Sequence, residues 1–273
     1  MKHAIMVEGH GSTANILQQT IDRLDDMDID FFVHWDLNYA KPHLSALKSE
    51  IHFVQSVSVK WGTDTMILAE LALFEAVYAS GKYDYVHLIS ANDIPLMTVQ
   101  YFISFFEKRH KQVFIGQSDY DENTEHRVTY YYPFRHLNYR GKLAQKFVLP
   151  IVKRINVLLH VNRQLGKSTV RKGPNWFSGP VDVIEAVLQY DDLQRFRHTY
   201  LGDEVLLQTV LANLSVTKND NAAALRYIDW DRGTPYLFGV EDVEELKSKV
   251  NTGFAFARKV MDTNVVMKIY DTK

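Results

Sequence analysis

The residues best suited to do chemistry are two adjacent carboxylates, Asp203 and Glu204, where an apolar helix begins in "YLGDEVLLQTVLANL" (residues 200–214). Gly202 or Asp203 can cap such a helix, and acidic residues in a first turn complement the helix dipole. Because acidic first turns are common, this stretch by itself favours an ordinary helix start over a general base. The rest of the chain has to decide between the two.

A glycine-containing turn near the N-terminus, "EGHGS" at residues 8–12, is a weak candidate for a phosphate-binding loop. It lacks the full G-x-G-x-x-G spacing and the lysine of a P-loop, so it does not predict a dinucleotide or triphosphate site. His10 has no second histidine at helical spacing and no cysteine cluster to complete a zinc site. The sequence therefore predicts no metal centre and no resident cofactor.

Pairs of aspartates separated by one residue can hold a divalent metal that neutralises a departing diphosphate. Such pairs occur at residues 28–30, 119–121 and 229–231, but none follows a central strand, and "LISANDIP" has only one carboxylate, Asp93. If a diphosphate binds without metal, cations must stabilise it. Arg232 and Lys259 are the candidates, because each lies among aromatic and glycine residues rather than in a charged surface run.

The composition of the chain restricts the type of protein that it can be. The chain has 273 residues, 46% of them hydrophobic, and no cysteine, which suits a well-buried core and a reducing compartment. The apolar run at the N-terminus is too short for a signal peptide core or a membrane span, so we expect a soluble, cytoplasmic protein. We expect no nucleic-acid partner, because the sequence pI is about 6.6 and no recognised nucleic-acid-binding module occurs.

Charge is unevenly distributed along the chain. Residues 126–181 contain eleven lysines or arginines and no aspartate or glutamate. Within this block, "KLAQKFVLPIVKRINVLLHVNRQLGK" predicts an amphipathic helix that could lie on an anionic membrane or receive an acidic ligand, which would place the protein at the inner face of the membrane. A core-facing helix with a solvated basic back fits residues 140–172 equally well.

Strands and helices alternate in the first part of the chain. Strands are predicted at "HAIMV" (3–7), "IDFFVHW" (29–35), "IHFVQ" (51–55), "YDYVHLIS" (83–90) and "QVFIGQ" (112–117), with helices near 13–24 and from Thr63 to Gly81. This alternation predicts an α/β fold with a mixed, mostly parallel sheet and helices on both faces. Ligands bind at the carboxyl ends of such strands, which places Glu8, His10, Asp36 and residues 90–93 along one rim.

The later part of the chain is more mixed. "RVTYYYPF" (127–134) predicts an extended segment, and "GPNWFSGPVDVIEAVLQY" (173–190) a strand that turns into a helix at Pro180. We expect one domain over residues 1–273. Its nucleotide-binding half would be 1–120 and its acceptor-binding and catalytic half 121–273.

Several ordered stretches resemble one known family. They are "FFVHWD", "VKWGTDTMILAELALFEAVYASGKYDYVHLISANDIPL", "GPNWFSGPVDVIEAVL", "GDEVLLQTVLAN", "RYIDW", "RGTPYLFG" and "FARKVMD". Together they resemble the core-2/I-branching β-1,6-N-acetylglucosaminyltransferases of glycosyltransferase family 14, which also contains peptide O-xylosyltransferases.

The resemblance implies a GT-A fold and an inverting, metal-independent transfer from a UDP-sugar, with N-acetylglucosamine as the favoured sugar. The family's general base corresponds to Glu204, so Asp203 can serve the helix start while Glu204 does the chemistry. The residues that contact the diphosphate correspond to Arg232 and Lys259, and the uridine pocket to Glu8, His10 and Asp36. Trp230 matches a position that stacks on acceptor sugar, and we assign Asp93 and Trp176 to the acceptor side as well.

The chain also departs from the secreted animal members, which have a membrane anchor, a stem and disulfides. We therefore expect a bacterial enzyme whose acceptor is a surface glycan, a lipid-linked glycan or a glycoprotein. The same fold with UDP-xylose or a UDP-hexose as donor is the first alternative. A non-catalytic glycan-binding partner subunit is the second.

Overall fold

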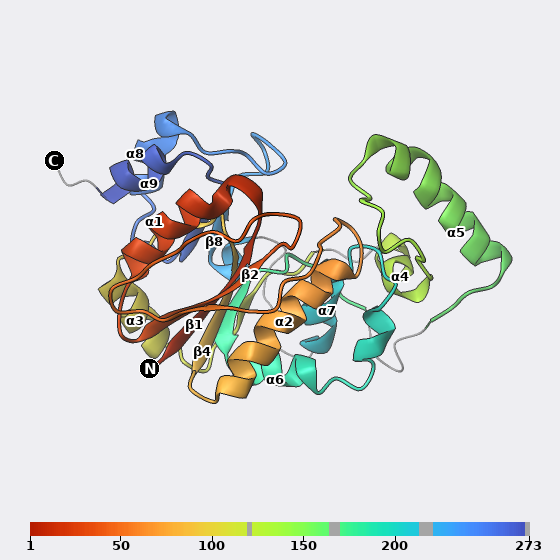
Figure 1. Cartoon of the computed structure of the whole chain (residues 1–273), viewed down its shortest axis with the longest axis horizontal. Helices are drawn as coiled ribbons and strands as arrows, with labels where there is room; N and C mark the ends of the chain where they lie inside the picture. The colour runs from red at the N-terminus through yellow and green to blue at the C-terminus, as the bar shows by residue number, and fades with distance from the viewer. Residues whose placement is uncertain (119–121, 164–169, 213–220, 271–273) are drawn as a thin grey trace.

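The structure is a computed structural model that describes residues 1–118, 122–163, 170–212 and 221–270. A six-stranded sheet lies at the centre of the molecule, with strand order β3-β2-β1-β4-β7-β6 (Figure 1). β1 to β4 are parallel, and β7 runs antiparallel to both of its neighbours. The strands of this sheet are β1 (His3–Gly9), β2 (Ile29–Trp35), β3 (Ile51–Phe53), β4 (Tyr85–Ser90), β6 (Phe114–Ile115) and β7 (Phe177–Pro180).

Helices cover both faces of this sheet. Side chains alternate along β1, so Ala4 and Met6 join the core under one helical layer while Ile5 and Val7 join the core under the other. Burial on both faces is the reason that the parallel strands are nearly continuous apolar runs in sequence. One layer contains α2 (Thr65–Ser80), α6 (Asp182–Leu188) and α7 (Asp203–Val210), and the other contains α1 (Ala14–Leu24) and α3 (Val99–Glu107).

The predicted α/β architecture is therefore confirmed, and several element boundaries agree closely. α2 ends at Gly81, whose φ of 63° is the left-handed conformation that favours glycine after a helix. The strand that turns into a helix at Pro180 is also present, as β7 followed by α6. The division of the chain into functional halves at residue 120 stays a prediction.

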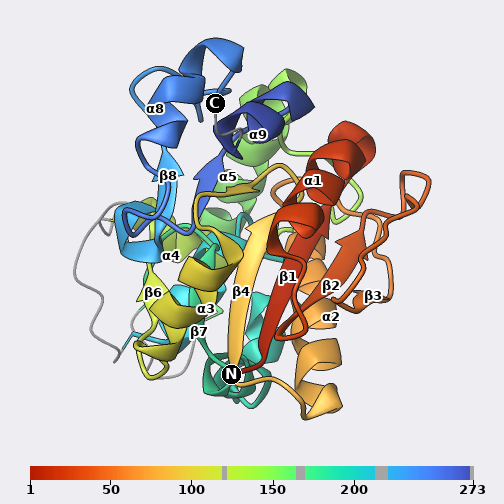
Figure 2. The ribbon, with the colours of Figure 1, turned by 90° about the vertical axis from the view of Figure 1, so that its left-hand side faces the viewer.

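A second, smaller sheet contains two strands from the C-terminal part of the chain. Its order is β5-β9-β8, formed by β5 (Ile94–Pro95), β9 (Phe256–Arg258) and β8 (Arg226–Ile228). It shares a core with α8 (Val243–Lys247) and α9 (Thr263–Tyr270), and Figure 2 shows these helices and β8 together at one end of the molecule. Residues from this part of the chain can therefore contribute to a site at the rim of the main sheet.

Residues 122–163, which include most of the basic block, form a lobe at the edge of the molecule (Figure 1). The end of the block contains β7 of the central sheet. The lobe contains α4 (Glu122–Thr129), a π-helical turn at Ala144–Val148 and α5 (Leu149–Leu158), with a small core of its own around Tyr132, Tyr139 and Val152. The helix predicted within residues 142–167 is present over Ala144–Leu158. Residues 159–163 are not helical, and residues 164–167 lie outside the described part of the chain. Among the described residues, no helix is long and apolar enough to cross a bilayer.

The extended segment predicted for residues 127–134 is wrong at its start. Val128 is fully buried on α4, and the backbone N–H of Tyr130 donates to the carbonyl of His126 at 3.3 Å. The aromatic run favours strands by propensity, but burial of one helical face outweighs it here. Arg127 is consequently held on a helix rather than on a strand.

Candidate active site

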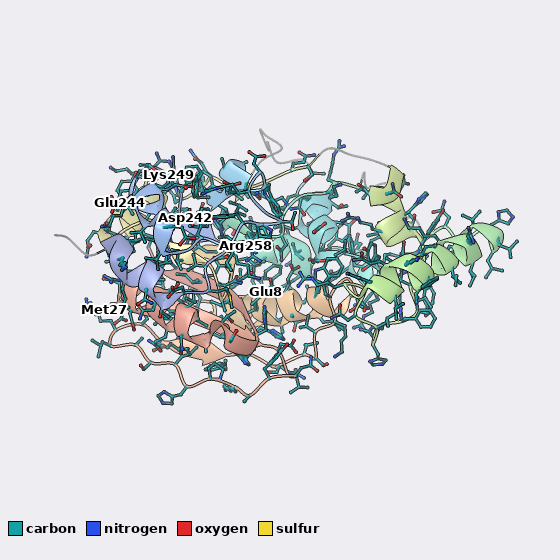
Figure 3. The ribbon with its side chains drawn as sticks, turned by 90° about the horizontal axis from the view of Figure 1, so that it is seen from above. Glu8, Met27, Asp242, Glu244, Lys249 and Arg258 are labelled. Atoms are coloured by element: carbon teal, nitrogen blue, oxygen red, sulfur yellow. The ribbon has the colours of Figure 1, made fainter. Side chains whose placement is uncertain are left out.

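A cleft of about 970 Å³ opens at the carboxyl ends of β1, β2 and β4. The strand register places Glu8 of β1 level with His34 of β2 and Ser90 of β4. Glu8 and Arg258 lie near the middle of the molecule in Figure 3, where the two sheets meet. The cleft therefore lies at the rim that parallel-sheet topology predicts.

Most of the predicted site residues line this cleft. They come from segments that are far apart in sequence and include Glu8, His10, Asp36, Trp176, Glu204, Trp230 and Lys259. Asp93 and Arg232 do not belong to its wall. The structure thus brings together residues proposed for donor binding, acceptor binding and catalysis, with two exceptions.

Glu204 lies in the first turn of α7 with its carboxylate at the cleft. Its side chain is 40% exposed, and its Oε2 accepts a hydrogen bond at 2.6 Å from Nη1 of Arg127, which comes from α4. Within the described residues its Oε1 has no hydrogen-bond partner. One oxygen is therefore fixed by a charged partner while the other can meet a ligand.

The neighbouring Asp203 has a different environment. It is the first residue of α7, after Gly202 at the cap position, and only 4% of it is exposed. Its Oδ1 is buried without a hydrogen-bond partner in the structure. Burial, together with the charges of Glu204 and Glu8, raises the pKa of Asp203 to about 8. At neutral pH its carboxyl group therefore retains a proton.

Two further acids interact with Asp203, namely Glu8, which lines the cleft, and Glu70, which does not. The side-chain amide of Asn175 donates to Glu70 at 2.8 Å and to Glu8 at 3.3 Å. Burial raises the pKa of Glu8 to about 7, opposed by Arg258 and by the Asn175 hydrogen bond, and burial also raises the pKa of Glu70. These carboxyl groups are close enough that their charges disfavour one another, so ionisation of one makes the next more costly.

The cationic side of the cleft is formed by the end of β9. Arg258 donates to the buried Asp93 at 2.8 Å, and its guanidinium lies 4.1 Å from the ring centre of Trp176. Lys259 follows directly and lines the cleft, and burial together with Arg258 lowers its pKa. Two positive side chains are thus held at one place, one of them by an ion pair and an aromatic face.

Asp93 is therefore placed differently from the prediction. It is 1% exposed, and besides Arg258 it accepts a hydrogen bond from the backbone N–H of Ser90 at 2.8 Å. A carboxylate that is buried and satisfied in this way cannot reach an acceptor in the cleft. Its contacts instead position Arg258.

Arg232 is also placed differently from the prediction. Its guanidinium donates to Asp229 at 2.6 Å, to Asp242 at 3.0 Å and to Glu245 at 2.7 and 2.8 Å. Neither Arg232 nor its partner Asp242 lines the cleft. Because three carboxylates already hold this side chain outside the cleft wall, the geometry does not support a contact with the diphosphate.

One group of side chains in the described residues has the spacing of metal ligands: Asp30, Glu50 and His52. Asp30 is 2.8 Å from the ammonium group of Lys2 and accepts a hydrogen bond from Tyr83 at 2.9 Å. None of these residues lines the cleft. The aspartate pair 119–121 lies outside the described residues.

Several residues in the site were not predicted. Glu70 could have been suspected from the sequence, because it is an acid in the first half of a mostly apolar helix. There was a weaker indication for Arg258, which directly precedes the predicted site residue Lys259. Arg127 had none, because it is 77 positions from Glu204 and lies in a segment predicted to be extended.

The mixed, mostly parallel sheet with helices on both faces and a cleft at its rim is consistent with a GT-A-like α/β fold. A family model described as Core-2/I-Branching enzyme matches residues 27–249. The chain belongs to this family, and the family consists of glycosyltransferases. A comparison with curated proteins found no match.

Proposed function

We propose that this glycosyltransferase moves a sugar with inversion, and without a metal ion, from a UDP-sugar to a hydroxyl group of a glycan, lipid-linked or glycoprotein acceptor. N-acetylglucosamine is the favoured sugar. The observation that carries the proposal is the environment of Glu204, whose Oε2 is bound by Arg127 while Oε1 remains open to the cleft. That arrangement suits a general base.

The reaction requires one proton transfer and one displacement. The acceptor oxygen attacks the anomeric carbon while its proton passes to Oε1 of Glu204, and the bond between that carbon and the diphosphate oxygen breaks. Because Arg127 holds the carboxylate of Glu204, this carboxylate is already oriented for the reaction before the acceptor binds. UDP leaves with the electron pair of the broken bond.

The negative charge on the departing UDP needs positive partners. Lys259 and Arg258 replace the predicted pair of Arg232 and Lys259 in our proposal, because both line the cleft. Charge-assisted hydrogen bonds from fixed cations are strong and require little reorganisation during the reaction. Asp93 and Trp176 support this role by holding Arg258.

The ends of β1 and β2 suit the nucleoside. Asp36 accepts hydrogen bonds through Oδ1 from Asn38 and from the backbone N–H of Val59. Within the described residues its Oδ2 has no such bond, so it can accept one from a ribose hydroxyl or a base N–H. On the acceptor side, Trp230 is 50% exposed at the cleft and offers a ring face to a sugar.

The base assignment is tested by Glu204→Gln, which keeps the shape of the side chain but cannot take the proton. Turnover should fall by about two to four orders of magnitude while UDP affinity stays nearly unchanged. Glu107→Gln, at an exposed residue at the end of α3, is the matched control and should keep full turnover. Full turnover by Glu204→Gln would show that the base is another group.

Metal independence and the cation assignment are tested by calorimetry with UDP, first in EDTA and then in excess manganese. We expect binding in EDTA that Lys259→Met weakens by about tenfold or more, the effect of losing one charge-assisted hydrogen bond. Binding only with manganese would contradict the metal-free mechanism. No binding under either condition would favour the non-catalytic glycan-binding alternative.

The donor sugar is tested separately with a panel of UDP-N-acetylglucosamine, UDP-xylose and UDP-hexoses. We expect the highest kcat/KM with UDP-N-acetylglucosamine. A preference for another member of the panel would leave the roles of Glu204 and Lys259 intact and change only the donor.

A further inference from the structure

An apolar stripe runs along the helical segment of the basic lobe. Five large apolar side chains at intervals of three or four residues are exposed, namely Leu143, Phe147, Ile151, Ile155 and Leu158. Leu158 is 77% exposed. Such a concentration of exposed apolar residues on one face marks an interaction surface.

The stripe faces away from the body of the protein. At about 100° per residue, Ile151, Ile155 and Leu158 lie within roughly 60° of one another on α5. The opposite side of the helix packs on the lobe through Leu149, Val152 and Asn156, which are buried. Figure 1 shows α5 at the outer edge of the molecule, away from the central sheet. Packing within the lobe therefore leaves the stripe exposed.

Positive charges flank the apolar stripe. Lys142, Lys146 and Arg154 are exposed. Lys153 does not belong to this border, because its ammonium group donates to Asn123 at 3.3 Å. No acidic residue occurs anywhere from 126 to 181 to neutralise them. An apolar face bordered by lysine and arginine is complementary to a surface with a hydrocarbon interior and anionic head groups.

The length of the segment is suited to lying on a bilayer. The helical stretch Ala144–Leu158 is about 22 Å long at 1.5 Å per residue, shorter than the hydrocarbon core of about 30 Å. Self-association through the same face would bring the flanking cations of two copies together. A docked apolar helix with its cations at the head groups has no such repulsion.

We propose that the outer face of this segment docks the protein on an anionic lipid bilayer, with the apolar stripe in the interface and the basic side chains of Lys142, Lys146 and Arg154 at the head groups. Leu143 follows Arg140, which lines the cleft, by three residues. Docking would therefore hold the mouth of the cleft near the lipid surface. The proposal does not depend on the donor or on the identity of the base.

The test is co-sedimentation of the full chain with vesicles of phosphatidylglycerol mixed with phosphatidylcholine, and with vesicles of phosphatidylcholine alone. We expect binding to the anionic vesicles that weakens as salt is raised. The double variant Ile155→Ser/Leu158→Ser should lower the partition coefficient by about tenfold or more, since each apolar side chain contributes to transfer. Removing Lys146 and Arg154 together should lower it by about fivefold per charge on anionic vesicles.

Leu47→Ser is the matched control, because Leu47 is 97% exposed on another part of the surface, and it should leave vesicle binding unchanged. Circular dichroism of each variant verifies that the fold is intact, as expected for changes at exposed positions. The proposal is overturned if the wild type ignores anionic vesicles, or if Leu47→Ser reduces binding as much as the double variant. A dimer in analytical ultracentrifugation that the double variant dissociates would also overturn it, because a second copy would then cover the stripe.

Discussion

The buried carboxyl group of Asp203 should make the stability of the protein depend on pH in a direction that one substitution can isolate. Its pKa is about 8 in the folded protein, against an ordinary value of 3.8. The folded state therefore retains a proton that the unfolded state releases. For an acid with a raised pKa, the stabilising contribution is complete below 3.8 and is lost as pH rises through 8.

Asp203→Asn removes this dependence while keeping a side chain that resembles the protonated acid. Between the two pKa values, each pH unit changes the free energy of unfolding by about 1.36 kcal/mol. From about pH 5 to about pH 7, the free energy of unfolding of the wild type should therefore fall by roughly 3 kcal/mol relative to that of the variant. The pKa values of Glu8 and Glu70 are also raised, and coupling among these acids shares the effect, so this value is an upper limit. The buried His3 and His87, whose pKa values are lowered by burial, act in the opposite direction but cancel in the comparison.

The measurement is urea denaturation followed by circular dichroism at several pH values, for the wild type, Asp203→Asn and the exposed control Glu107→Gln. The difference in free energy of unfolding between Asp203→Asn and the wild type should grow with pH. The same difference for Glu107→Gln should stay nearly constant. If the Asp203→Asn difference is flat, or if the wild type gains on the variant as pH rises, then Asp203 is ionised in the fold and our account of its environment is wrong.

Two further substitutions test the surroundings of the base. Gly202→Ala should lower the free energy of unfolding by about 1–3 kcal/mol in urea denaturation, because an added Cβ would overlap the side chains of Thr199 and Ile67; unchanged stability would mean that α7 can shift at its start. Arg127→Gln should lower kcat by about tenfold or more with little change in KM, because Glu204 loses the partner that orients it. Arg127→Lys should restore part of the lost turnover, and equal activity of the wild type and Arg127→Gln would exclude a positioning role.

The fold and one side of the site could be predicted because they depend on local patterns. Apolar strands alternating with helices determine a parallel sheet, and a parallel sheet collects the residues at its strand ends. Glu8, His10 and Asp36 therefore line the cleft as predicted. Glu204 also lines the cleft, but the local pattern predicts only the helix start, and the site role of Glu204 is expected from the family resemblance.

The failures have local and long-range causes. The position of Arg232 could have been anticipated, because Asp229 is three residues before it and further acids follow at 242 and 245. The pairing of Arg127 with Glu204 could not have been anticipated from the sequence, because it depends on how α4 packs against α7. A single charge on a helix has many possible partners until that packing is known.

Adjacent residues at a helix start point in different directions, and this resolves the two interpretations of Asp203 and Glu204. Asp203 points into the protein, where burial keeps it protonated, while Glu204 points into the cleft and pairs with Arg127. The two features are linked, because a neutral Asp203 places no second negative charge beside the carboxylate that Arg127 binds. If Asp203 were ionised, Arg127 would have to balance two acids and would be less available to fix one. The helix start and the general base are thus one arrangement, in which the buried acid allows the exposed one to carry the charge.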